Sequence, residues 1–360
     1  RGYSKCLSEN RVYVRKVAAD KIVIALIYVD DILLFAHDLD TMAKEKEYLK
    51  SKFALTDGGE VRHFLGIKIE RDHKAMTTTL SQTAYIEAAL KRFGLDKETG
   101  SKMPTPAKLP LRSTMGKDVD PDRSRAYAQR VGCLKWVAAT TRSDLIFSAN
   151  ALGRYQSAPT EEHFDLTTQA FRYLRKTADH KLTYRIGQRP DAPLVGYCDA
   201  DYANDVDTRR STTGFVYYLF GNPVTWSSRL QPTVALSTTE AEYMALCEGM
   251  REGMWIKTLL GELGLWPGGP VRLFTDNEGC RSLATNPYDH RRTKHISVMY
   301  RAVTESVEQG RLTVERVDTK ENPSDVCTKP FTGVRLHDAR LRLQIEPPPS
   351  DSPPTHTHGH

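Results

Sequence analysis

Two short apolar runs flank a pair of acids near the start of the chain. The runs extend from Ile22 to Tyr28 and from Ile32 to Ala36, and Asp30 and Asp31 lie between them. Apolar runs of this length, separated by a short polar segment, predict the two strands of a β-hairpin. Both carboxylates are therefore expected at the tip of that hairpin.

Helical and strand-like patterns follow. Amphipathic helices are predicted around Thr41 to Phe53 and from Gln82 to Phe93, and Gly94 is placed to close the second. Between them, the run from Phe64 to Ile69 is typical of a strand. Residues 100–122 contain several prolines and no periodicity, so they are expected to form a linker or a long loop.

Two helical segments occupy the middle of the chain, from about Tyr127 to Tyr155 with an interruption near Arg142, and from about Glu161 to Lys176. From Leu194 the pattern changes to short strands and helices in the order β-β-β-α-β-α-β-α. That order implies a mixed sheet flanked by helices, an α/β (α+β) fold class. The predicted elements are strands at Val195–Cys198, Gly214–Phe220 and around Val224 and Trp226, a long helix, a strand at Val271–Thr275, a helix at 294–308 and a strand at Leu312–Val317.

The long helix has a recognisable start and end. Ser237 and Glu240 form the S-x-x-E pattern of a capping box, and Gly264 is placed to end the helix. Glu242 then falls in its first turns.

Four acids occupy positions that a mixed sheet can bring together. Asp199 and Asp276 follow predicted strands, Glu242 lies early in the long helix, and Asp325 stands at an expected helix start. Clustered carboxylates repel one another unless cations neutralise them. Two Mg²⁺ ions would do so, and would activate a water and stabilise the leaving oxygen in phosphodiester hydrolysis. Taken singly, each acid would sooner be assigned to a turn or a cap, so the surrounding motifs have to decide.

Composition sets broad limits on the kind of protein. The 360 residues are 39% hydrophobic and 27% charged, which suffices for two globular domains. No apolar stretch reaches the roughly eighteen residues of a membrane span, and the first residues lack the order of a signal peptide. We therefore expect a soluble, intracellular protein. Six cysteines without a C-x-x-C pair indicate neither a disulfide framework nor a zinc ribbon.

The net charge of +6 argues only weakly for a polyanionic partner. Basic residues do gather after Asp276, where they form either a solvated face or a contact for nucleic acid. They are Arg281, Arg291, Arg292, Lys294, His295 and Arg301.

Seven sequence strings in a fixed order make the second half resemble the ribonuclease H region of copia-type retrotransposon polyproteins. The strings are Gly196-Tyr-Cys-Asp-Ala-Asp-Tyr-Ala203, Asp207-Thr-Arg-Arg-Ser-Thr-Thr-Gly-Phe215, Val224-Thr-Trp-Ser-Ser228, Ala235-Leu-Ser-Thr-Thr-Glu-Ala-Glu-Tyr-Met-Ala245, Thr275-Asp-Asn277, Arg292-Thr-Lys-His-Ile296 and Asp325-Val-Cys-Thr-Lys-Pro330. With the first half included, the likeness extends from about Gly2 to Phe331, about nine-tenths of the chain.

This resemblance implies a ribonuclease H-like mixed sheet and a metal-binding, catalytic tetrad of Asp199, Glu242, Asp276 and Asp325. It further implies two Mg²⁺ ions, for which Mn²⁺ can substitute, and hydrolysis of the RNA strand of RNA–DNA hybrids. Two assignments have competitors. Glu240 could replace Glu242, although the capping box already gives it a role, and Asp201 is the reserve for Asp199.

Candidate contacts to nucleic acid surround the tetrad. Polar groups near Glu242 and Asp276 are candidates to recognise ribose 2′-hydroxyls, which only RNA has. Basic residues further along are expected at the backbone, and His295 either acts there, packs, or replaces a histidine that cellular ribonucleases H carry before the fourth acid. The candidates are Ser237, Thr238, Thr239, Asn277, Arg292, Lys294 and His295.

The first half resembles the reverse transcriptase of the same polyproteins. Tyr28-Val-Asp-Asp31 in its hairpin looks like the palm signature, and Phe64-Leu-Gly-Ile67, Arg130-Val-Gly-Cys133 and Arg172-Tyr-Leu-Arg175 fit the same family. In the family a further aspartate and the nucleotide-binding fingers come from segments that would precede Arg1. Asp30 and Asp31 are therefore expected to be a polymerase remnant, without DNA synthesis from this chain alone.

These expectations divide the chain into a partial palm or thumb-like region with linker (1–122), a helical connection (123–190), a ribonuclease H-like domain (191–332) and a tail (333–360), disordered from 347. The expected function is a retrotransposon-derived ribonuclease H fused to a truncated reverse transcriptase. The alternatives are a fragment of an RNA-directed DNA polymerase polyprotein and a non-catalytic nucleic-acid-binding remnant. The expected partners are an RNA–DNA hybrid and the rest of the polyprotein, in a cytoplasmic virus-like particle or the nucleus if the element is active, with no membrane.

Overall fold

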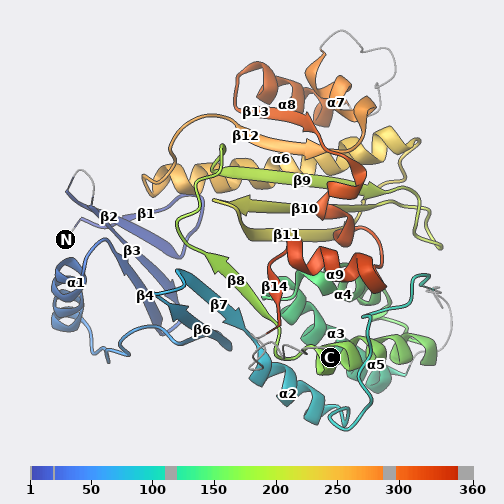
Figure 1. Ribbon diagram of the computed structural model, residues 1–360, viewed down its shortest axis with the longest axis horizontal. Helices are drawn as coiled ribbons and strands as arrows, with labels where there is room; N and C mark the ends of the chain where they lie inside the picture. The colour runs from blue at the N-terminus through green and yellow to red at the C-terminus, as the bar shows by residue number, and fades with distance from the viewer. Residues whose placement is uncertain (1, 19–20, 110–119, 287–296, 348–360) are drawn as a thin grey trace, which may run out of the picture.

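The computed structural model describes residues 2–18, 21–109, 120–286 and 297–347. Its strands form three sheets, and its helices pack between and around them (Figure 1). None of the helices in those four ranges is both long and apolar enough to cross a membrane.

The first sheet has four antiparallel strands in the order β1-β2-β3-β4. The elements are β1 (Ser4–Lys5), β2 (Val12–Ala18), β3 (Lys21–Tyr28), β4 (Asp31–Ala36) and the helix α1 (Leu39–Lys52). β3 and β4 are the predicted hairpin, in which Tyr28 pairs with Asp31 across a turn that holds Val29 at positive φ. The hairpin and the helix after it are confirmed.

The second sheet has the order β14-β8-β7-β6-β5, all antiparallel. Its strands are β5 (His63–Phe64), β6 (Ile67–Asp72), β7 (Thr77–Ser81), β8 (Lys181–Arg185) and β14 (Ile345–Glu346). The single strand predicted over 64–69 is wrong, because Leu65 and Gly66 both adopt positive φ and turn the chain between two strands. β8 and β14 come from far along the sequence, so this sheet ties distant segments together.

A helical layer packs beside these sheets around one hydrophobic core. It contains α2 (Thr83–Arg92), α3 (Pro121–Thr140), the 3-10 turn η1 (Ser143–Leu145), α4 (Ile146–Leu152), the 3-10 turn η2 (Gly153–Tyr155) and α5 (Glu161–Lys176). The predicted interruption near Arg142 is confirmed. The guanidinium of Arg142 is fully buried, donates to both carboxylate oxygens of Asp144 at 3.0 and 2.8 Å, and donates to the Thr177 carbonyl at 2.8 Å.

The third sheet has the order β11-β10-β9-β12-β13. β9 to β11 are antiparallel, and β12 runs parallel to both β9 and β13, so the predicted mixed sheet is confirmed. The strands and the helices that pack on them are β9 (Leu194–Asp201), β10 (Thr212–Leu219), β11 (Asn222–Leu230), α6 (Thr238–Glu262), β12 (Val271–Thr275), α7 (Glu278–Thr285), α8 (Ser297–Glu308) and β13 (Leu312–Arg316). This is a ribonuclease H-like arrangement of a mixed sheet with flanking helices.

The faces of this sheet are covered by different parts of the chain. α6 crosses one face and, with α7 and α8, encloses a second hydrophobic core (Figure 1). The other face meets α4 and the 3-10 turn η6 (Pro323–Cys327), and the Trp226 indole donates to the Ala138 carbonyl of α3 at 2.8 Å. α7 was not predicted, and the helix expected over 294–308 is described only from Ser297.

The last described segment is ordered by packing. After η5 (Thr319–Glu321) and η6, the helix α9 (Gly333–Arg342) and β14 continue to Glu346, neither of which the sequence pattern predicted. Leu336, Leu343 and Ile345 are buried in the core of the helical layer. The disorder predicted from 347 onward falls on residues 348–360, which lie outside the described ranges.

Candidate active site

Three of the four predicted acids meet at one end of the third sheet. β9 and β12 are parallel neighbours with Tyr197 paired to Phe274, so Asp199 and Asp276, each two residues further on, fall side by side. α6 crosses β9 and β12 and brings Glu242 to the same point. Carboxylate oxygens of Asp199, Glu242 and Asp276 all lie within 4.8 Å of one another. These three residues are called the triad below.

Two members of the triad, Asp199 and Glu242, are buried, and Asp276 is half-buried. Asp199 is 3% exposed and Glu242 8%, and Glu242 Oε2 has no hydrogen-bond partner among the described residues. Burial, reinforced by the charges of Asp199 and Asp276, raises the pKa of Glu242 to about 9. Burial also raises the pKa of Asp199 to about 7, and the neighbouring acids add to that rise. The ionised triad is thus held at a cost.

The donor set of the triad fits a divalent cation. Carboxylate oxygens are the hard ligands that Mg²⁺ and Mn²⁺ prefer, and the Glu242 oxygen without a partner is available for one. Within the described part of the chain, no Lys, Arg or His forms an ion pair with Glu242 or Asp276. A bound cation would supply the missing counter-charge.

Asp325, the fourth predicted acid, lies beside the triad and outside it. It is 3% exposed in η6, and the amide of Asn322 anchors the start of that turn by donating to the Cys198 carbonyl at 3.0 Å. Lys329 Nζ lies 2.7 Å from Asp325 Oδ1 and 3.8 Å from Asp199 Oδ2. Arg335 approaches the other oxygen of Asp325 at 3.2 Å. The chain's own cations therefore neutralise Asp325.

Residues 328 and 329 are functional candidates that the sequence reasoning missed. The Thr328 hydroxyl donates to Asp199 Oδ2, which fixes the orientation of that carboxylate. Burial lowers the pKa of Lys329, but Asp199 and Asp325 outweigh it and raise the pKa overall, so the ammonium stays charged. The i,i+4 spacing of Asp325 and Lys329 was a readable signal, because such residues become neighbours on a helical turn.

The two competing acids lie elsewhere. Glu240 Oε2 accepts from the Leu236 N–H at 2.7 Å, and Ser237 Oγ accepts from the Glu240 N–H at 3.1 Å. Glu240 thus helps to start α6, as predicted, although it reaches Leu236 and not the Ser237 N–H that a capping box requires. Asp201 is half-buried at the end of β9, and burial raises its pKa. Neither acid belongs to the triad.

The predicted nucleic-acid contacts are only partly described. Ser237 caps α6 and Thr238 begins it, both exposed, whereas Thr239 is half-buried; Asn277 caps α7 by accepting from the Cys280 N–H at 2.8 Å. A Cβ placed on Gly279 would lie 3.3 Å from the Thr239 hydroxyl and 3.2 Å from Asn277 Oδ1, so the amino ends of α6 and α7 adjoin beside the triad. The remaining three, Arg292, Lys294 and His295, lie outside the described residues.

The acids of the hairpin have no such surroundings. Asp30 and Asp31 are exposed at the β3–β4 turn. Over the four described ranges, the triad is the one group of three potential ligands whose atoms lie within 4.8 Å of one another. Asp30 and Asp31 therefore lack a third described acid.

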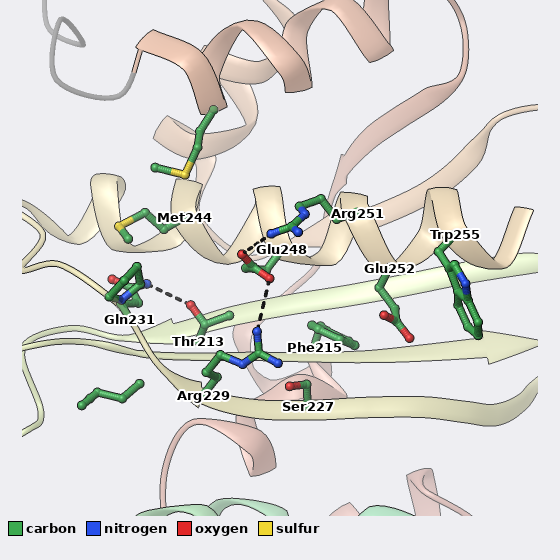
Figure 2. A pocket seen from close by; sticks show the side chains of 13 residues that line it. Thr213, Phe215, Ser227, Arg229, Gln231, Met244, Glu248, Arg251, Glu252 and Trp255 are labelled. Carbon is green, nitrogen blue, oxygen red and sulfur yellow. Dashed lines mark hydrogen bonds and ion pairs between the residues drawn. The ribbon is translucent and has the colours of Figure 1, made fainter. Parts of the chain in front are cut away.

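A cavity of about 350 Å³ lies between α6 and the strands β10 and β11 (Figure 2). Three of its charged groups are paired, since Glu248 lies 3.0 Å from Arg251 and 4.0 Å from Arg229, and Glu252 accepts a hydrogen bond from the Thr225 hydroxyl at 2.8 Å. The triad carboxylates do not line this cavity. It is therefore separate from the candidate active site.

Both halves of the chain match known proteins. Residues 1–107 match the family model described as Reverse transcriptase (RNA-dependent DNA polymerase). The chain is 35% identical to the Retrovirus-related Pol polyprotein from transposon TNT 1-94 of Nicotiana tabacum, over 91% of this chain and 25% of that protein. It is 32% identical to a putative transposon Ty5-1 protein of Saccharomyces cerevisiae, over 70% of this chain and 80% of the relative.

Among solved structures, the foamy viral protease–reverse transcriptase in complex with RNA/DNA hybrid shares 17% identity and a TM-score of 0.42, over 82% of this chain and 36% of that one. The chain spans about a quarter of the length of the Pol polyproteins that it matches.

Proposed function

Because the chain belongs to the copia-type retrotransposon Pol polyproteins, we propose that its third sheet carries a metal-dependent ribonuclease H. The chain contains a reverse transcriptase region and a ribonuclease H-like fold. The reaction is endonucleolytic hydrolysis of the RNA strand of RNA–DNA hybrids. Such hybrids are what a reverse transcriptase produces from an RNA template.

The observation that carries the proposal is the convergence of the triad. Three carboxylates from β9, α6 and the end of β12 lie within 4.8 Å of one another, and two of them are buried. Leaving buried like charges together without a counter-ion is unfavourable, so a fold that assembles them is suited to holding cations. A buried carboxylate with a purely structural role would be expected to use both oxygens in hydrogen bonds, whereas Glu242 Oε2 has no partner among the described residues.

In the proposed assignment Asp199, Glu242 and Asp276 hold one divalent ion, and Asp199 with Asp325 holds a second. Two Mg²⁺ or Mn²⁺ ions, when bound, supply an activated water and stabilise the leaving oxygen. The chain's own groups position these ligands. Thr328 orients Asp199 through its hydroxyl, and Asn322 ties the turn that carries Asp325 to β9.

The adjoining starts of α6 and α7 support a nucleic-acid contact beside the triad. Backbone N–H groups at helix amino ends favour phosphate, and the hydroxyls of Thr238 and Thr239 are suited to ribose 2′-hydroxyls. Arg292, Lys294 and His295 remain proposed contacts to the backbone of the hybrid. The matched reverse transcriptase region makes RNA-directed DNA synthesis a second candidate, but among the described residues Asp30 and Asp31 join no third potential metal ligand.

The test is cleavage of an end-labelled RNA strand in a hybrid duplex, with Mg²⁺ and with chelator. The purified chain should cut only with the metal, and Asp276→Asn should abolish cutting while the circular dichroism spectrum stays unchanged. Asp338→Asn on the exposed face of α9 is the matched control and should cut normally. Metal-independent cutting, or near-normal turnover by the Asp276 variant, would refute the assignment. Hybrid binding without any cutting would favour a non-catalytic remnant.

A further inference from the structure

We infer that the Lys329 ammonium is a built-in counter-ion of the Asp199–Asp325 pair, which a second divalent ion has to displace. The inference rests on the proposed function, because it assumes that the triad binds a divalent ion first. It makes Lys329 a positioning residue that sets the order and strength of metal binding.

The geometry places one ammonium between two acids of the proposed site. Lys329 Nζ lies 2.7 Å from Asp325 Oδ1 and 3.8 Å from Asp199 Oδ2. Both carboxylates are buried, whereas the Lys329 side chain is 31% exposed. Lys329 therefore reaches the buried pair with a partly exposed side chain, and its four-carbon stem is flexible.

The two halves of the site consequently differ in charge balance. Within the described residues, Glu242 and Asp276 have no ion-pair partner, and an entering cation meets only acids there. Asp325 has two basic partners, Lys329 on one oxygen and Arg335 on the other. Two cations a few ångströms apart repel each other strongly where water is scarce. The first divalent ion should thus bind at the triad, and the second should bind more weakly.

The experiment is a titration of the whole metal-free chain with Mn²⁺ alone, followed by calorimetry and by electron paramagnetic resonance. The wild-type chain should show one tighter and one weaker site. In Lys329→Met the weaker affinity should rise by about tenfold or more, because the competing charge is gone, while the tighter affinity changes little. In chelator the melting temperature of the variant should fall, because Asp199 and Asp325 lose their shared counter-ion.

Matched variants separate this role from a general loss of charge. Lys320→Met removes a positive charge from the nearby turn η5 and should leave both affinities unchanged. Lys329→Arg keeps the charge, so the second site should stay weak. Lys329→Gln keeps a polar head group and is measured beside the methionine variant to guard against misfolding. Asp325→Asn should remove the weaker site and spare the tighter one.

The outcomes separate the two proposals. If Asp276→Asn removes the tighter site but neither neutral Lys329 variant strengthens the weaker one, the inference is wrong and the metal-binding triad stands. If the wild-type chain binds no Mn²⁺ at all, both fall. A weaker second site in the neutral Lys329 variants would instead make Lys329 a structural support for Asp325 and would overturn the inference.

Discussion

The two acidic sites of this chain are built in opposite ways. Asp30 and Asp31 are neighbours in sequence, are exposed at a hairpin turn and meet no third described acid. The triad draws Asp199 from β9, Glu242 from α6 and Asp276 from the residue after β12, which are far apart in sequence, and it buries two of them. Proximity along the chain therefore says little about a site, whereas convergence of separate elements creates one.

The physical difference is desolvation. Exposed carboxylates are solvated by water and gain little from a metal ion, whereas buried ones have lost that solvation and gain much. The raised pKa of Glu242, caused first by burial and then by its acidic neighbours, is the signature of the second situation. The predictions below test whether this contrast is also a contrast in function.

The largest effect is expected from Asp199→Asn, because Asp199 belongs to the triad and also faces Asp325 through Lys329. Hybrid cleavage in Mg²⁺ should fall at least about a hundredfold, since even the outer partners of metal ligands typically matter by roughly tenfold to a hundredfold. Single-turnover cleavage rates at saturating enzyme measure this. Retention of more than a tenth of the wild-type rate would contradict the two-ion assignment.

A smaller effect is expected where packing positions the fourth acid. A methyl group on Gly214 of β10 would lie 2.6 Å from Cβ of Cys327 and 2.8 Å from Cγ2 of Thr328. Gly214→Ala should therefore push η6 away and loosen both Asp325 and the Thr328 bond to Asp199. Cleavage should drop by roughly tenfold, as expected for displaced ligands. Gly261→Ala, where an added methyl meets nothing within 4 Å, is the control.

The sequence predicted most elements whose pattern is local. The hairpin at Asp30, the helix at 161–176 and the individual strands of the third sheet depend on short-range periodicity, and the structure has them. The structure adds the parallel pairing of β9 and β12, which brings Asp199 beside Asp276.

What the sequence did not predict depends on distant packing or on single backbone angles. The positive φ angles of Leu65 and Gly66 split one expected strand. β14 is only two residues long and is stabilised by pairing with β8, so its own pattern carries no signal. The ion pair of Asp325 with Arg335 was equally hidden, because it depends on how α9 folds back toward η6, whereas the Asp325–Lys329 pair is local.

Glu240→Ala sharpens the contrast within α6 itself, since Glu240 supports the helix start and Glu242 belongs to the triad. Losing the bond to the Leu236 N–H should cost about 1 kcal/mol of stability in urea denaturation, with cleavage near normal. Glu242→Gln should do the reverse and abolish cleavage without loss of stability. An inactive but fully stable Glu240→Ala protein would transfer the metal role to Glu240.

The smallest effect on cleavage is expected at the hairpin. Replacing both Asp30 and Asp31 by asparagine should leave hybrid cleavage unchanged within about twofold, because both side chains are exposed on the first sheet and the triad belongs to the third. Neither the wild-type chain nor the double variant should extend a primer annealed to a template, since two exposed carboxylates provide neither a complete two-metal clamp nor a nucleotide pocket. Supplying deoxynucleotides and Mn²⁺ in excess makes this a demanding test. Primer extension by the wild-type chain that disappears in the double variant would show that the hairpin is a working polymerase site, and exposure would then no longer distinguish the two acidic sites.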